Sequence, residues 1–529
     1  MITMRERLTG AEALAAVLKS RGVSKAFAVV GNQVNDIAIA FENAGIQIVT
    51  CRHEGNAALM AEGYARRSRK IGVVLTIPGP GVANALIGVL EAFTACTAVL
   101  VITASQPSRS FPLQHDKLFH GLDQIQITKS ITNNSGSISS RCDFDLALTK
   151  ALSTLESGRP RPVLLEFDIP WMRRNDDYDI SKFAIESAPP FAVEVAKEIA
   201  TAIARSKRCI VIAGMGIFSN HAIHSFRSFI ERSGIPVLTT TLGKGVISEF
   251  DKFYIGKLYE ACCNEVIANS DLILAIGVRF TQVDTNDWTL PLGSIPLIHI
   301  DSDPHVINNE YKSYISVTAD INDALNTLVP LLPENVGARA DLNDLREMVQ
   351  KSRGEAPVIA SMLGSLIRNE DALVVDVHEQ GYPLMEHLPV FNGNNFLFSG
   401  LSLALGYGIP AAIGARFAST EGQVICFCGD GGFLLSSPEL ATVSHYKLDI
   451  FFIVVDDSAY GTIKTNQSAN HGISIGVDIT NPKFDLLSEA YDFKYFIAGN
   501  LKEVSELLNA AYFTKGPRVL VIPKGLLTN

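Results

Sequence analysis

The chain alternates short apolar runs with amphipathic segments over most of its length. Runs that are apolar throughout are typical of strands buried on both faces, and helical patterns lie between most of them. The pattern predicts a parallel sheet with helices on both sides. The runs of the first series are KAFAVVG (25–31), IQIVTC (46–51), IGVVLTI (71–77), TAVLVITAS (97–105) and RPVLLEFD (161–168).

The same alternation resumes twice further along the chain. A polar, proline-containing stretch over 173–191 and a weakly patterned stretch over 333–357 separate the three series. We therefore predict an α/β protein with three doubly wound parallel-sheet domains, at residues 1–185, 186–345 and 346–529. The later runs are RCIVIAGMG (208–216), IPVLTTT (235–241), DLILAIG (271–277) and IPLIHIDSD (295–303), then DALVVDV (371–377), QVICFCGDG (423–431), DIFFIVVDD (449–457) and PRVLVIP (517–523).

The composition narrows the class of protein. Of 529 residues, 47% are hydrophobic and 19% are charged, and no apolar run reaches the ~20 residues that a membrane helix needs. The N-terminus is charged and helical in pattern, without the apolar core of a secretory signal, so we expect a cytoplasmic protein with no membrane attachment.

The eight cysteines form no CxxC pair and indicate neither a zinc site nor disulfides. A formal net charge of −10 disfavours nucleic acid as a partner and leaves small molecules as the expected substrates.

Two acidic points follow neighbouring apolar runs in the third series. Asp430 stands in the sequence GDGG after one run, and Asp456–Asp457 end the next. Ligands of open α/β sheets bind beyond the carboxyl ends of the strands, where two carboxylates repel each other unless a cation lies between them. Mg²⁺ suits such a site, and the glycines of GDGG, which we predict as the turn at the end of the strand, would let backbone N–H groups approach a phosphate. Ser437 is expected to cap a helix over 438–447. The alternative is an ordinary turn followed by a solvated strand end.

A second pattern lies near the N-terminus. The run that ends at Cys51 is followed by a helix that begins near Glu54, and the run that ends at Thr76 leads into the turn PGPG (78–81). With GDGG and the segment GYGIPAAIGA (406–415), these motifs have the order and spacing of the thiamine-diphosphate enzymes of the acetolactate synthase and 2-oxo-acid decarboxylase family. The chain resembles that family over essentially its whole length, and it is also similar to carboxyethylarginine synthase.

The resemblance implies thiamine diphosphate and Mg²⁺ as cofactors, and it implies a set of site residues. Glu54 matches the glutamate that activates the cofactor through a hydrogen bond to its aminopyrimidine ring; the alternative is a first-turn residue that interacts with the helix dipole. Leu405 matches the bulky apolar residue under the two rings of the cofactor. The metal ligands would be Asp430, Asp457 and the backbone carbonyl of Ala459. The other residues expected to bind the cofactor are Pro78, Asn84, Glu379, Leu403, Gly429, Gly431, Gly432 and Tyr460.

The chain departs from the family pattern in three respects. Asp456–Asp457 stands where the family usually has Asn–Asn, which keeps oxygen ligands but adds negative charge beside the diphosphate. His120 stands near the usual position of a glutamine and, with His378, is a predicted catalytic residue; the alternative for His120 is a histidine of a surface loop. The tandem His–His pair of pyruvate decarboxylases is absent, which argues against simple aldehyde release.

Glycine-rich turns follow the strands of the middle domain, as in AGMGIF (213–218) and GVRFTQ (277–282). Acetolactate synthases place FAD at such turns, but other relatives keep the turns without a flavin, so FAD is not favoured. We expect a carboligase that decarboxylates pyruvate or a similar 2-oxo acid and adds the remainder to an acceptor carbonyl. The alternatives are a decarboxylase that releases an aldehyde, a carbon–carbon lyase or hydrolase of a diketone, and a cofactor-binding regulatory subunit. The family's arrangement implies a homodimer or homotetramer.

Overall fold

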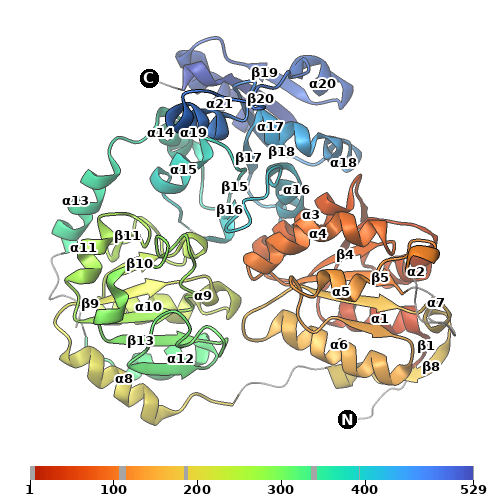
Figure 1. Ribbon diagram of the computed structural model, residues 1–529, viewed down its shortest axis with the longest axis horizontal. Helices are drawn as coiled ribbons and strands as arrows, with labels where there is room; N and C mark the ends of the chain where they lie inside the picture. The colour runs from red at the N-terminus through yellow and green to blue at the C-terminus, as the bar shows by residue number, and fades with distance from the viewer. Residues whose placement is uncertain (1–5, 106–114, 184–188, 335–341, 392, 528–529) are drawn as a thin grey trace. The chain divides into compact units, whose positions relative to one another are not determined.

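The computed structural model describes residues 6–105, 115–183, 189–334, 342–391 and 393–527 (Figure 1). The chain forms two compact units, one of residues 1–185, 365–384 and 397–529 and the other of residues 186–364 and 385–396. Helix α13 (Leu342–Arg353) includes residue 345, where the middle domain was predicted to end, and the bounds of the three domains stay a prediction. Three six-stranded sheets with helices around them confirm the predicted doubly wound α/β fold.

The N-terminal sheet has the strand order β3-β2-β4-β5-β7-β6, and its neighbouring strands run parallel. Helix α1 begins with a capping box, in which Thr9 and Glu12 satisfy each other's backbone N–H groups. A separate antiparallel pair joins β1 (Glu6–Thr9) to β8 (Asn175–Tyr178). The strands of the sheet are β2 (Lys25–Val29), β3 (Gln47–Thr50), β4 (Gly72–Thr76), β5 (Val99–Ala104), β6 (Gly136–Ile138) and β7 (Val163–Phe167), and its main helices are α1 (Gly10–Ser20), α2 (Asn35–Asn43), α3 (Glu54–Ser68), α4 (Pro80–Thr94), α5 (Gln124–Thr128) and α6 (Arg141–Glu156).

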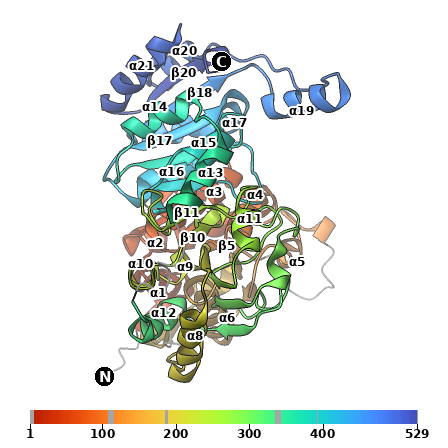
Figure 2. The same ribbon diagram turned by 90° about the vertical axis from the view of Figure 1, so that its left-hand side faces the viewer.

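The C-terminal sheet has the order β16-β15-β17-β18-β20-β19. When the strands of each sheet are numbered along the chain, the N-terminal and C-terminal sheets both read 2-1-3-4-6-5. The strands are β15 (Ala372–Val375), β16 (Phe396–Phe398), β17 (Val424–Gly429), β18 (Ile450–Asp456), β19 (Lys494–Ile497) and β20 (Arg518–Pro523). The helices are α14 (Val358–Leu366), α15 (Gly381–His387), α16 (Gly408–Ala418), α17 (Asp430–Leu435), α18 (Leu440–His445), α19 (Gly461–His471), α20 (Phe484–Ala490) and α21 (Leu501–Phe513). Helix α19 buries none of its residues and projects from the rest of this domain (Figure 2).

The central sheet is connected differently. Its order β11-β10-β9-β12-β13-β14 reads 3-2-1-4-5-6 when numbered along the chain, which is the order of dinucleotide-binding folds. Its strands are β9 (Cys209–Ala213), β10 (Val237–Thr239), β11 (Tyr254–Lys257), β12 (Leu272–Ile276), β13 (Leu297–Asp301) and β14 (Ile315–Thr318). Its main helices are α8 (Val193–Arg205), α10 (Ile223–Ser233), α11 (Cys263–Ala268), α12 (Ile321–Leu328) and α13.

Every apolar run named in the sequence analysis contains a strand. Besides the β1–β8 pair, the strands outside those runs are β6, β11, β14, β16 and β19, and each of these lies at the edge of its sheet. Some residues of β19, β14 and β6 are exposed or half-buried, so these strands lack the continuous apolar signal that marks a central strand. Strands β11 and β16 are buried but have only four and three residues.

The N-terminal and C-terminal domains share one hydrophobic core, centred on helices α3 and α16, which lie side by side in Figure 1. Small residues allow this close approach. A Cβ at Gly63 would lie 2.6 Å from the carbonyl oxygen of Ala411, and a Cβ at Gly414 would lie 2.1 Å from the carbonyl oxygen of Met60. Helix α3 is consequently buried on every face from Glu54 to Ala65.

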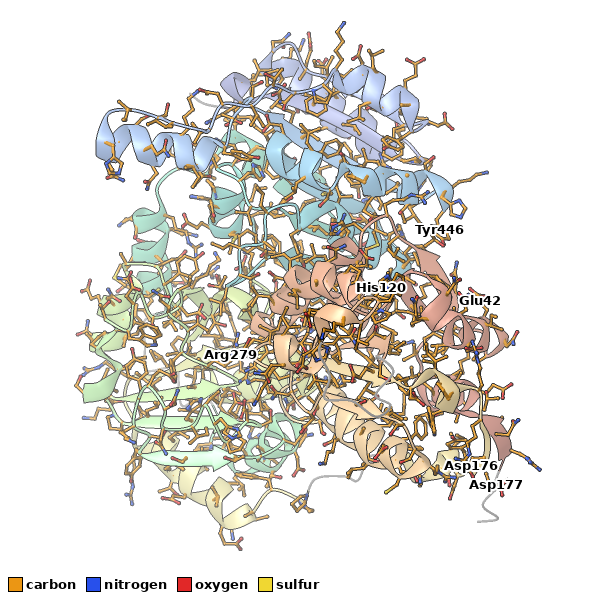
Figure 3. All side chains as sticks on the ribbon, turned by 45° about the vertical axis from the view of Figure 1, so that its right-hand side comes forward. Glu42, His120, Asp176, Asp177, Arg279 and Tyr446 are labelled. Carbon is orange, nitrogen blue, oxygen red and sulfur yellow. The ribbon has the colours of Figure 1, made fainter. Side chains whose placement is uncertain are left out.

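Buried polar groups also join these two domains. The Glu439 carboxylate, which is fully buried, accepts hydrogen bonds from the backbone N–H groups of Arg52 (2.9 Å) and His53 (3.1 Å), just before α3 begins. The Tyr446 hydroxyl accepts a hydrogen bond from the backbone N–H of Thr50 (2.9 Å) on edge strand β3. Figure 3 labels Tyr446 at this edge, together with Glu42, whose carboxylate accepts from the backbone N–H of Ile48 in the same strand.

A second buried polar group between α3 and α16 has an unusual protonation equilibrium. The Tyr407 hydroxyl donates to Glu62 (2.9 Å), and Arg66 lies 3.6 Å from the same carboxylate. Burial raises the pKa of Glu62 to about 7, although Arg66 and the hydrogen bond from Tyr407 lower it.

No helix in the described part of the chain is both long and apolar enough to cross a membrane.

Candidate functional site

A cavity of about 350 Å³ lies at the carboxyl ends of strands β15, β17 and β18. This is the end of an open α/β sheet at which ligands bind. The predicted site residues that line it are His378, Glu379, Leu405, Gly429, Asp430, Gly431, Gly432, Asp457, Ala459 and Tyr460. The structure therefore brings together residues that are far apart in sequence.

Asp430 is the most buried carboxylate of the cavity, with 1% of its surface exposed. Its Oδ2 accepts a hydrogen bond from the Asn481 side-chain amide (2.6 Å), and the same amide nitrogen donates to Asp456 (2.8 Å). The pKa of Asp430 is raised to about 6, because burial and the charges of Asp457 and Asp456 raise it by more than the hydrogen bonds from Asn481 and Gly431 lower it. Because negative groups crowd here, a cation would stabilise their ionised forms.

Asp457 and Ala459 lie beside this carboxylate, just beyond strand β18. Asp457 Oδ1 accepts a hydrogen bond from the backbone N–H of Ala459 (3.2 Å), and an isolated antiparallel bridge joins Ala459 to Asp478. Between them Ser458 has a positive φ of 50°, a conformation that few residues other than glycine adopt. Carboxylate and carbonyl oxygens are the ligands that Mg²⁺ prefers, so the residues present fit a magnesium ion.

The glycines of the GDGG motif are required by close packing. A Cβ at Gly432 would lie 2.6 Å from the Asp376 carboxylate, one at Gly431 would lie 2.9 Å from the Tyr460 ring, and one at Gly429 would lie 3.0 Å from His378 Cβ. The prediction of a turn here was wrong, because β17 ends at Gly429 and α17 begins at Asp430.

The predicted helix cap at Ser437 was also wrong. Ser437 begins a 3-10 turn (Ser437–Glu439), and its hydroxyl donates to the carbonyl of Leu434 in the preceding turn (2.8 Å). The segment predicted as one helix is divided between this 3-10 turn and the short helix α18. The hydroxyl therefore satisfies a carbonyl at the end of α17 instead of an N–H at the start of a helix.

Two leucines predicted to contact the cofactor lie in different positions. Leu405 lines the cavity and keeps 37% of its surface exposed, as a residue that covers a bound ring system would. Leu403 is 41% exposed and has a positive φ of 46°, but it is not among the residues that line the cavity. Of the two, Leu405 therefore lies at the cavity, and the roles of both stay predictions.

His378 and Glu379 follow strand β15. The His378 ring packs on Phe427 with centroids 4.8 Å apart, and burial lowers its pKa to about 3, which makes it a neutral imidazole at physiological pH. Beneath them the buried Asp376 accepts a hydrogen bond from the backbone N–H of Val377 (2.7 Å). Burial raises the pKa of Asp376 to about 6 despite its backbone hydrogen bonds. Glu379 binds Lys524, with 2.5 Å between its Oε2 and the lysine Nζ.

The N-terminal site residues form a separate cluster. Glu54 is the first residue of α3 and is buried, with 8% of its surface exposed, and its Oε2 accepts a hydrogen bond from the Asn84 amide (2.9 Å). Its Oε1 faces Gly81, at which a Cβ would lie 3.4 Å away. Pro78 is buried in the turn that precedes Gly81. None of these residues lines the cavity described above.

The backbone of His120, which Figure 3 labels, lies against Gly79 in the turn of this cluster. Its backbone carbonyl would lie 2.3 Å from a Cβ at Gly79, so only glycine fits in that turn. The residue has a positive φ of 59°, and its half-buried ring stacks on Phe119 with centroids 3.9 Å apart. The backbone of His120 therefore adjoins the glycine turn, and the catalytic role of its ring stays a prediction.

Some residues that hold these motifs in place were not predicted from the sequence. Gln124 accepts from the backbone N–H of Gly79 (3.0 Å) and donates to Glu166 (2.9 Å), and Asn481 bridges Asp430 and Asp456. No local pattern marks these two amides. Lys524 could have been found, because it follows β20 at the same edge of the sheet as Asp430 and Asp457.

The glycine turns of the central domain are explained by packing between the turns. A Cβ at Gly214 would lie 2.2 Å from the carbonyl oxygen of Gly277, and one at Gly243 would lie 2.5 Å from the carbonyl oxygen of Ala213. These contacts bring the ends of β9, β10 and β12 together. They account for the glycines without a bound flavin.

Comparisons with known proteins identify the family. Models of the thiamine pyrophosphate enzymes match the chain in three places: the N-terminal TPP binding domain at residues 8–127, the central domain at 196–328 and the C-terminal TPP binding domain at 381–522.

Similar curated proteins match the chain over nearly its whole length. The acetolactate synthase large subunit of Lactococcus lactis is 29% identical, with 99% of this chain and 96% of that protein aligned. Acetolactate synthase isozyme 2 large subunit of Escherichia coli is 24% identical, with 99% and 96% aligned. A probable 2-ketoarginine decarboxylase of Pseudomonas aeruginosa is 29% identical, with 97% and 93% aligned. Together with the three sheets and the arrangement of their motifs, these matches show that the chain belongs to the thiamine pyrophosphate enzymes, in the group of the acetolactate synthases and related decarboxylases.

Proposed function

We propose that the protein is a carboligase that uses thiamine diphosphate and Mg²⁺ to decarboxylate pyruvate or a similar 2-oxo acid and join the remainder to an acceptor carbonyl. The observation that carries the proposal is the cavity that combines Asp430, Asp457 and Ala459 with Leu405. It offers hard oxygen ligands for a metal that binds a diphosphate, beside an apolar surface for a ring system. When bound, thiamine diphosphate supplies a carbon nucleophile and an electron sink.

Different residues of the chain would bind the metal, support the rings of the cofactor and contact the substrate. Asp430, Asp457 and the carbonyl of Ala459 would hold Mg²⁺, and Leu405 would support the rings. The Asn84 amide holds Oε2 of Glu54, so Oε1 would make the hydrogen bond to the pyrimidine ring that sets its protonation. His378 and His120 would face the substrate. His378, as a neutral imidazole, would accept or donate a hydrogen bond without adding positive charge.

We propose further that the active form is a homodimer or homotetramer. Glu54, Pro78 and Asn84 do not line the cavity formed by residues 377–524 of the same chain. A carboxyl group that sets the protonation of a bound ring must lie within hydrogen-bond distance of it. A second copy of the chain, bringing its own Glu54 to the cavity, would complete the site.

A decarboxylase that releases an aldehyde is the second candidate. The observation that favours it is the similarity to the probable 2-ketoarginine decarboxylase, which is as high as that to the acetolactate synthase of Lactococcus lactis. Its name also indicates that members of this group act on 2-oxo acids larger than pyruvate.

Product analysis separates these functions. The purified protein with thiamine diphosphate and Mg²⁺ would be given pyruvate or 2-oxo acids with longer side chains, with and without a set of aldehyde and keto acceptors. CO₂ release with a ligated product supports the carboligase, and CO₂ with free aldehyde supports the decarboxylase. Cleavage of a diketone without CO₂ identifies a carbon–carbon hydrolase, and cofactor binding without turnover of any substrate identifies a regulatory subunit.

A further inference from the structure

The cavity contains an ion-pair cluster that the family resemblance does not explain. Lys524 Nζ lies 2.5 Å from Glu379 Oε2 and 3.3 Å from Asp457 Oδ2, and all three residues line the cavity. Their side chains are 23%, 32% and 16% exposed in the order lysine, glutamate, aspartate, so water screens the cluster only in part. One ammonium group therefore forms ion pairs with two carboxylates.

The sheet itself places Lys524 in this cluster. Strand β20 pairs with β18 in parallel, and the register sets Pro523 opposite Asp456. The residues that directly follow the two strands, Lys524 after β20 and Asp457 after β18, are therefore neighbours at the carboxyl edge of the sheet. The contact follows from the pairing of two central strands and does not depend on the conformation of a long loop.

Gly461 leaves room for the two carboxylates. A Cβ at this position would lie 2.2 Å from Asp457 Oδ2 and 3.0 Å from Glu379 Oε2. Both oxygen atoms that bind Lys524 thus face the same small space. Two carboxylates so close together are stable as ions only with a cation between them.

The other charges around the cavity show why the position of Lys524 matters for the binding of a diphosphate. Asp430, Asp457 and Glu379 line the cavity, and Asp456 is joined to Asp430 by the Asn481 amide. Among the described residues that line the cavity, Lys524 is the only lysine or arginine. An anionic cofactor has to approach this group of carboxylates, and Lys524 offsets their repulsion together with the metal.

We propose that Lys524 is a positioning residue that allows a carboxylate at position 457 to do what an amide would do there. An asparagine would turn its carbonyl oxygen to the metal and its NH₂ group toward Glu379. A carboxylate has no donor, and Lys524 supplies one by binding Oδ2, which leaves Oδ1, on the Ala459 side, for the metal. Asp457 and Lys524 then act as a pair. The inference rests on the proposed function, since it concerns the same metal and diphosphate.

A double-mutant cycle measures this coupling. The affinities for Mg²⁺ and thiamine diphosphate would be determined by calorimetry for the full-length protein and for Lys524→Met, Asp457→Asn and the double variant. Lys524→Met should weaken thiamine diphosphate binding about tenfold, because two unpaired carboxylates then face the diphosphate. Asp457→Asn alone should change it less than about threefold, and the double variant should regain most of the loss, because the new amide can donate to Glu379.

Two further variants separate charge pairing from a general effect on the fold. Lys524→Arg keeps the cation and should bind the cofactor within about threefold of the natural protein. Lys464→Met removes a nearby lysine that pairs with Asp478 instead (2.7 Å), and it should leave the affinity unchanged. Melting curves without cofactor show whether each variant folds. If Lys524→Met does not fold, the cofactor affinity of Lys524→Arg is the deciding measurement.

The outcomes distinguish this inference from the proposed function. If the natural protein binds the cofactor but the double variant loses as much affinity as Lys524→Met, the two residues are not coupled and the inference is wrong. The same conclusion follows if Lys524→Arg binds as weakly as Lys524→Met. If the natural protein binds neither Mg²⁺ nor thiamine diphosphate, the proposed function fails, and the inference fails with it.

Discussion

The N-terminal and C-terminal domains have the same strand order but carry different kinds of side chains after their corresponding strands. Both sheets read 2-1-3-4-6-5, and in both the functional segments follow the second and third strands along the chain. In the N-terminal sheet these segments hold Glu54, paired with an amide, and the turn at Pro78. In the C-terminal sheet they hold Leu405 and Asp430, and the next strand adds Asp457. One framework thus provides both places, and in the proposed function the side chains decide whether it would hold a ring or a metal and diphosphate.

The central domain sharpens this contrast. Its sheet has the dinucleotide-binding order 3-2-1-4-5-6, yet its glycine turns pack on one another, as Gly214 does on Gly277. Strand order and glycine turns alone therefore do not decide whether this domain binds a nucleotide.

The largest effect is expected from Glu54→Gln in the N-terminal domain. The variant keeps a hydrogen-bonding group of the same shape but cannot shift the protonation of the ring, so turnover should fall about 10²- to 10⁴-fold. Cofactor affinity and the melting temperature should change little. Hydrogen–deuterium exchange at C2 of thiamine diphosphate, followed by NMR, measures the step directly, and an unchanged exchange rate would exclude this role.

Asp430→Ala tests the corresponding position of the C-terminal domain. Loss of a neighbour of a metal ligand commonly costs 10- to 100-fold in metal affinity, so loss of the ligand itself should cost about 100-fold or more. Affinity for thiamine diphosphate should fall in parallel, as seen by calorimetry with and without Mg²⁺. An affinity within threefold of the natural protein would show that the metal binds elsewhere.

Gly63→Ala tests the packing that joins the two domains. A glycine-to-alanine change inside a helix normally stabilises it by about 1 kcal/mol. Here the new Cβ would lie 2.6 Å from the carbonyl oxygen of Ala411, and overpacking of this kind costs about 1–3 kcal/mol, so the melting temperature should fall.

Gly364→Ala is the matched control for this helix substitution. It also lies in a helix, α14, but its nearest neighbour would be Leu388 Cδ1 at 3.5 Å, an ordinary contact distance. Its melting temperature should stay the same or rise. Equal effects of the two substitutions would show that α3 and α16 are not in close contact.

The smallest effect is a pH dependence at the interface of α3 and α16. With a pKa of about 7, Glu62 binds a proton in the folded protein at pH values where the unfolded chain has lost it. Stability should therefore fall as the pH rises from about 4.5 to 7, by about 1–3 kcal/mol from this group. Glu62→Gln removes the titration, so its melting temperature relative to the natural protein should rise between pH 5 and pH 8. Parallel pH profiles would contradict this expectation.

The strands in the middle of each sheet could be predicted from the sequence, because their side chains are buried on both faces. Five of the six edge strands were not predicted, because β19 and β14 expose some of their residues and β11 and β16 are short, whereas the edge strand β3 lies in a predicted run. Asp430 and Asp457 were also predictable as neighbours, because they follow predicted strands directly, whereas Leu405 was named only from the family resemblance. Gln124 and Asn481 were not, since each acts through partners far away in the chain. Lys524 is an intermediate case, which becomes visible once β18 and β20 are known to pair.

The most direct test of the two-part site mixes two inactive variants. If Glu54 of one copy completes the cavity of another, a mixed dimer of Glu54→Gln and Asp430→Ala chains contains one site with both natural residues. Equal amounts of the two variants, unfolded together and refolded, should then recover about a quarter of the natural activity, because half of the dimers are mixed and half of their sites are intact. If the refolded mixture stays as inactive as the two variants refolded separately, while the natural protein recovers under the same conditions, Glu54 and Asp430 do not form one site across two chains.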